Sequence, residues 1–79
     1  MELTPEQEAA VAAKQELLKA EAFLVKLKES ADSEQLRGVK DSLRAQRQEY
    51  REKHRQHIIA LEMSGDIIVT PDAVEIKSA

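Results

Sequence analysis

Four arginines in the second half of the chain have the spacing of one helical stripe. They follow one another at intervals of three, four and four residues, and they are Arg44, Arg47, Arg51 and Arg55. At about 100° per residue, this spacing places all four guanidinium groups on one side of a helix. Guanidinium forks match the oxygens of phosphates and carboxylates. The stripe therefore predicts contact with a polyanion or with an acidic partner surface.

A structural explanation of the same stripe competes with this interpretation. If the helix packs against the N-terminal part of the chain, Glu8 and Glu16 come level with Arg55 and Arg47, and each exposed pair contributes about 0 to 1 kcal/mol. The basic block is also local. Residues 44–57 hold five Lys or Arg and two Asp or Glu, whereas the remainder holds seven and thirteen, and the net charge is −3. This balance disfavours a general polyanion binder, so nucleic-acid binding is the alternative prediction.

Two histidines are the only candidates for a metal site. His54 and His57 are three residues apart and share one side of a helix, but no suitably spaced carboxylate completes a ligand set there. We expect them to lie in the seam between two helices, with neither a metal nor a cofactor bound. The chain has no cysteine and only two glycines, which leaves no thiol nucleophile and no glycine-rich phosphate loop. We therefore predict no catalytic residues and no enzymatic activity.

The elements that must position these side chains begin with a helix over residues 5–29. Thr4 is a natural N-cap, Pro5 suits the first helical position, and Gln7 stands where a capping box places its second partner. One broad apolar face follows, small near its start and large near its end: Ala9, Ala10, Ala13, Leu17, Ala20, Phe23, Leu24 and Leu27.

A second helix is predicted over residues 33–63. Asp32 or Ser33 can cap it, and the short polar link before it implies an antiparallel helical hairpin. Facing positions then have numbers that sum to about 63, which brings Leu36 opposite Leu27 and Leu43 opposite Ala20. Gly65 follows as a natural C-cap.

The C-terminal segment changes to β-branched, alternating sequence. Residues 66–70 and 73–77 flank Pro71-Asp72, which is typical of a short β-hairpin over residues 66–77. Thr70-Pro71 can alternatively begin a helical turn, as Thr4-Pro5 does. An isolated two-stranded hairpin is unstable in water, so these strands must pack on the helices or pair with another chain.

A second apolar stripe lies on the back of the first helix. Its members recur at intervals of seven, four and three residues, and they are Val11, Leu18, Ala22 and Val25. Such a row predicts a second packing partner, which is the C-terminal hairpin, another copy of the chain, or a different protein. Because a chain of 79 residues builds only a small core, we favour self-association as a dimer or ring.

These patterns predict one mainly α domain over residues 1–79, in which an antiparallel two-helix hairpin and a short C-terminal β-hairpin are completed by oligomerisation. The N-terminus has no apolar signal segment, and no run approaches the roughly 18 apolar residues of a membrane span, so we expect a cytoplasmic protein without membrane contact. The predicted function is a non-enzymatic protein–protein interaction module, as an oligomeric assembly, adaptor or inhibitor component. The alternative is a nucleic-acid-binding regulator that uses the arginine stripe.

Overall fold

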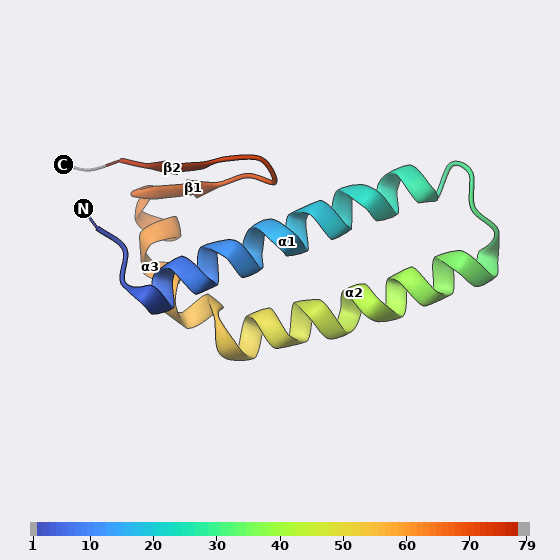
Figure 1. Ribbon diagram of the computed structural model, residues 1–79, viewed down its shortest axis with the longest axis horizontal. Coiled ribbons are helices and arrows are strands. Elements are labelled where there is room, and N and C mark those ends of the chain that lie inside the picture. The colour runs from blue at the N-terminus through green and yellow to red at the C-terminus, as the bar shows by residue number, and fades with distance from the viewer. Residues whose placement is uncertain (1, 78–79) are drawn as a thin grey trace.

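The structure is a computed structural model that describes residues 2–77. In this part of the chain it contains three helices and one two-stranded antiparallel sheet: α1 (Pro5–Leu27), α2 (Ser33–Lys53), α3 (Arg55–Ser64), β1 (Ile67–Val69) and β2 (Val74–Ile76). Figure 1 shows α1 and α2 side by side and running in opposite directions, with α3 and the strands gathered at one end. We call that end proximal and the α1–α2 turn distal. The molecule is elongated, with principal extents of 47 × 22 × 18 Å.

The helix starts follow the caps that the sequence predicts. Thr4 Oγ1 accepts a hydrogen bond from the Gln7 backbone N–H at 3.1 Å, and Gln7 Oε1 accepts one from the Thr4 N–H at 2.9 Å. Asp32 Oδ1 accepts from the Gln35 N–H at 2.9 Å and caps α2. Both caps satisfy N–H groups that the first helical turn leaves without intrahelical partners.

The predicted helix over residues 33–63 is divided at His54, and the expectation of one continuous helix was wrong. His54 has φ −120° and ψ −42°, and α3 leaves in a new direction toward β1 (Figure 1). The change of direction accompanies the complete burial of Ile58, and this burial outweighs the local preference for an unbroken helix.

The first helix is also slightly shorter than predicted. It ends at Leu27 rather than near residue 29, and the N–H groups of Ser30 and Ala31 both donate to the Leu27 carbonyl. The chain then turns through residues 28–32 into α2. Differences of one or two residues are ordinary at fraying helix ends.

The predicted pair of C-terminal strands is confirmed as a two-stranded antiparallel sheet, and its strands are shorter than the predicted segments 66–70 and 73–77. Ile67 pairs with Ile76 and Val69 with Val74, so these side chains lie on one face of the sheet. The Thr70 N–H donates to the Ala73 carbonyl at 2.9 Å and closes the turn. Gly65 ends α3 with φ 81°, a left-handed conformation that glycine adopts without steric cost.

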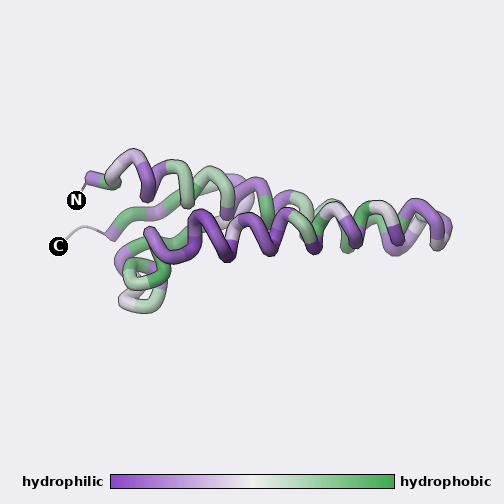
Figure 2. The backbone as a smooth tube through the Cα atoms, turned by 90° about the horizontal axis from the view of Figure 1, so that it is seen from below, coloured by the Kyte–Doolittle hydropathy of each residue, from purple (hydrophilic) through white to green (hydrophobic). Residues whose placement is uncertain are grey.

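The core is concentrated at the proximal end. Its buried members are Ala10, Val11, Leu17, Leu24, Leu43, Tyr50, Ile58 and Ile67, and only Leu24 and Leu43 belong to the distal half of the hairpin. Figure 2 shows the hydrophobic stretches of α3 and the strands beside the largely hydrophilic α2. The distal half is therefore a single layer of two helices without a third element over it.

Candidate interaction surface

The second apolar stripe of α1 is divided between the core and the surface. Val11 is only 6% exposed and belongs to the core, so its predicted place in an intermolecular interface is corrected. The C-terminal segment accounts for this, because β1 contacts α1 and the Gln15 Nε2 donates to the Thr70 carbonyl at 3.3 Å. Leu18 is half-buried, whereas Ala22 and Val25 remain exposed. The part of the stripe that is exposed for contact with a partner is thus its distal part, Ala22 and Val25.

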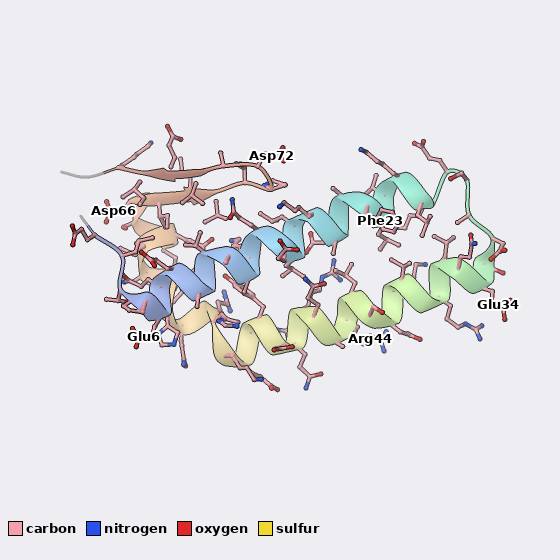
Figure 3. The ribbon with its side chains drawn as sticks, in the orientation of Figure 1. Glu6, Phe23, Glu34, Arg44, Asp66 and Asp72 are labelled. Carbon is pink, nitrogen blue, oxygen red and sulfur yellow. The ribbon has the colours of Figure 1, made fainter. Side chains whose placement is uncertain are left out.

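Three of the four predicted arginines come together in a shallow groove between α1 and α2. The groove has a volume of about 430 Å³. Its lining consists of two buried leucines and five basic residues: Leu24, Leu43, Lys28, Lys40, Arg44, Arg47 and Arg51. Figure 3 places Arg44 on the distal part of α2, below the part of α1 that carries Phe23. We call this feature the basic groove.

The cations of the basic groove are poorly neutralised within the chain. The Arg47 Nε lies 3.4 Å from Glu21 Oε1. Among the described residues, no carboxylate lies within ion-pairing distance of Lys28, Lys40, Arg44 or Arg51. Intramolecular pairing therefore does not explain the stripe.

The ion pairs observed between the helices differ from the predicted pairs of Glu8 with Arg55 and Glu16 with Arg47. Arg47 pairs with Glu21 and not with Glu16, which lies 3.7 Å from Lys19 on its own helix. Within residues 2–77, Glu8 and Arg55 likewise form no ion pair with each other. The Arg47 partner is displaced along α1 by five positions from the one that the facing rule predicted.

Arg55 is separated from the other three arginines. It follows the division at His54 and lines a different hollow with residues of α1 and α3, which include Lys14, Glu62 and Met63. The four-residue stripe assumed a continuous helix, and the change of direction ends that periodicity. Arg55 is accordingly excluded from the basic groove.

A half-buried polar junction lies beside Arg55. Lys14 of α1 forms an ion pair with Glu62 of α3, and Tyr50 is 8% exposed next to them. Burial, together with the nearby Glu62 carboxylate, raises the pKa of Tyr50 to about 12. Its hydroxyl oxygen is buried and has no hydrogen-bond partner among residues 2–77. This junction joins the helices and keeps the tyrosine neutral.

The histidines take positions at the proximal end of the seam. Both are half-buried, and the His54 ring stacks on Tyr50 with 6.4 Å between centroids and 25° between planes. Over residues 2–77, no group of three or more His, Cys, Asp or Glu side chains has an arrangement that could hold a metal ion.

Sequence reasoning missed two members of the basic groove, Lys28 and Lys40. Lys40 precedes Arg44 by four residues, so the helical spacing of the stripe could have included it. Lys28 comes from the other helix, and only the three-dimensional packing brings it to the same groove.

No protein-family model, curated protein or solved structure matches this chain. Within the described part of the chain, no helix combines the length and apolar character required to cross a membrane.

Proposed function

We propose that the chain is a non-enzymatic protein–protein interaction module, working as an assembly, adaptor or inhibitor component. The distal half of the helical hairpin carries this proposal. There Val25 is 63% exposed, Phe23 is 56% exposed and Ala22 is exposed, and no third element covers them. Ala22 and Val25 are three residues apart and share one side of α1, whereas Phe23 lies on another side. Exposed apolar side chains of this kind are typical of surfaces that a partner buries.

Self-association is the simplest form of this proposal. Two copies that pack Ala22 and Val25 against each other would supply the missing layer and give a bundle of helices. Exposed apolar side chains also occur at the proximal end, where Met63 is 82% exposed and Ile68 and Ile76 are each 40% exposed. The core at that end is covered by α3 and the strands, so we assign the self-association interface to the distal surface.

The test compares two aspartate variants by absolute mass in solution. Val25→Asp puts a charge in the exposed apolar surface, and we expect it to weaken association of the chain about tenfold or more. Ala45→Asp puts the same charge on an exposed position of α2 outside the surface and should behave as the wild type. Light scattering gives the mass, and circular dichroism checks that both variants keep their helix content.

Two outcomes would contradict this proposal in its self-associating form. One is a wild-type chain that stays monomeric at about millimolar concentration, where even weak complexes form. The other is a Val25→Asp variant that assembles as well as Ala45→Asp does.

Nucleic-acid binding is a second candidate, because the cations of the basic groove lack carboxylate partners. Phosphate contacts by these side chains would make affinity fall steeply with salt, by about 0.7 in log–log slope per contact on a single strand. Single-stranded DNA is therefore one of the probes in the experiment described below.

A further inference from the structure

We propose that the basic groove is the docking site for a short, acidic, amphipathic helix of a partner protein. This inference rests on the proposed function and specifies the chemistry of the partner. The groove is lined by Leu24 and the C-cap residue Lys28 of α1 and by five residues of α2, and its floor consists of two leucines that are only 9% and 2% exposed. A third helix fits such a groove with an apolar ridge toward the floor and carboxylates toward both walls.

The charges of the walls select an acidic occupant. Lys28 on one wall and Lys40, Arg44 and Arg51 on the other are without carboxylate partners among the described residues. The basic residues of α2 are also three or four positions apart, so their like charges oppose the isolated helix. An occupant with carboxylates along two edges would neutralise both walls and remove this repulsion.

The floor and rim of the groove favour a helix over a bare phosphate chain. Leu24 and Leu43 form the floor. Val25 follows Glu21 by four residues and precedes Lys28 by three, so this exposed apolar side chain borders the α1 wall. The lining residues include no aromatic ring on which a base could stack.

Within the chain itself, one helix already packs on α1 and α2 in the way that we propose for the partner helix. At the proximal end, α3 packs against both α1 and α2 and brings the carboxylate of Glu62 to Lys14. Lys14 and Lys28 are fourteen residues apart on α1, which places them within about 40° of each other around the helix. The proposed partner helix would therefore repeat, in the distal half, the arrangement of α3 in the proximal half.

The length of the groove also limits what can bind. From Lys40 to Arg51 the rise along α2 is about 16 Å, or three helical turns. Acidic side chains lie beyond the distal end of the groove, at the turn between the helices: Glu29, Asp32 and Glu34. A long polyanion would meet these negative charges, whereas a helix of three to four turns would not.

A second copy of the chain is disfavoured as the occupant. A two-fold symmetric pairing of groove against groove would bring the two arginine rows together and create like-charge repulsion. The proposed occupant of the basic groove is therefore an acidic helix from a different protein.

The experiment uses the full chain and three fluorescent probes, with binding followed by anisotropy. The first probe is a helical peptide of about 14 residues, built from alanine with leucine on one face and glutamate on both flanks. The second has the same composition in scrambled order, and the third is single-stranded DNA of about 20 nucleotides. We expect the amphipathic peptide to bind more tightly than the other two, and its affinity to fall as salt rises from about 0.05 to 0.3 M.

A pair of charge reversals locates the binding site. Arg44→Glu, in the groove, should weaken the amphipathic peptide about tenfold or more, whereas Lys19→Glu, on another side of α1, should change its affinity less than about twofold. The groove variant is expected to fold, because the new Glu stands four residues from Lys40 and three from Arg47. Circular dichroism checks the helix content of both variants.

Three results would overturn the proposal: equal binding of the amphipathic and scrambled peptides, tighter binding of the DNA, or equal loss in the two variants. If the wild-type chain does not bind the peptide but still self-associates, and Val25→Asp abolishes that self-association, this inference is rejected and the proposed function stands. If Val25→Asp abolishes self-association but the variant still binds the peptide through Arg44, the self-association surface and the basic groove are distinct, and docking in the groove is supported.

Discussion

Tyr50 is the titratable residue of the described chain whose pKa is clearly shifted by its environment. Burial and the neighbouring Glu62 carboxylate raise its pKa to about 12, because both disfavour the phenolate. It is the only tyrosine, and the chain has no tryptophan, so ultraviolet absorbance near 295 nm follows this one group. We expect its titration midpoint near pH 12 in the folded chain and about pH 10 in denaturant. A midpoint near 10 in the folded chain would contradict the described burial.

The same shift fixes the sign of a stability change. Because the folded chain favours the neutral phenol, this contribution to stability is complete below about pH 10 and is lost as the pH rises through about 12. Tyr50→Phe has no such group and serves as the control in urea unfolding at both pH values. The two proteins share every other titratable group, so the difference between them isolates Tyr50.

The two glycines predict opposite responses to the same substitution. A Cβ added at Gly38 would have no neighbour within 4 Å among the described residues, so no close packing requires glycine there. We expect Gly38→Ala to raise the free energy of unfolding by about 1 kcal/mol, because alanine favours the helix interior. Gly65→Ala should lower it by about 1 kcal/mol, since its φ is 81°. Urea unfolding monitored by circular dichroism measures both changes, and a destabilised Gly38→Ala variant would refute the first.

At the scale of elements, the ion pair between Lys14 and Glu62 attaches α3 to α1. Their side chains are only 26% and 22% exposed, so solvent screens the pair less than a surface pair. We expect Glu62→Gln and Lys14→Gln each to lower the free energy of unfolding by about 1 kcal/mol. The double variant should lose less than the sum, with a coupling energy of about 0.5 to 1 kcal/mol. Strict additivity in this double-mutant cycle would show that the two side chains do not interact.

The local features of these elements were predictable because their causes are local. Thr4 and Asp32 cap helices through atoms three residues away, and Pro71-Asp72 separates two β-branched segments. The division at His54 has no such signal, since neither Gly nor Pro lies near it. It accompanies the complete burial of Ile58, which depends on tertiary packing.

The candidate surfaces were predictable in part for the same reason. Helical spacing predicts Arg44, Arg47 and Arg51 on one side of a helix, and these three residues line one groove. The same spacing does not hold for Arg55, because the helix changes direction before it. Val11 shares the periodicity of Val25, so the sequence pattern could not show that the C-terminal segment covers one and leaves the other exposed.

For the molecule as a whole, the multi-element core and the two-helix part of the hairpin are separated along its long axis. The proximal end stacks helices and strands around the core, whereas the distal end relies on one seam between α1 and α2. The groove also keeps like charges three and four residues apart, which disfavours the isolated helix by a few tenths of a kcal/mol per pair. We infer that the distal half is less stable in the free chain than it would be with a partner bound to the groove.

The arrangement of the chain ends has a practical consequence. Both ends of the described chain lie at the proximal end, as Figure 1 shows. A surface tether, a fluorescent label or a fused protein attached near either end would therefore leave the opposite end of the 47 Å long axis free. The chain can be immobilised or joined to a carrier with its basic groove still open to solution.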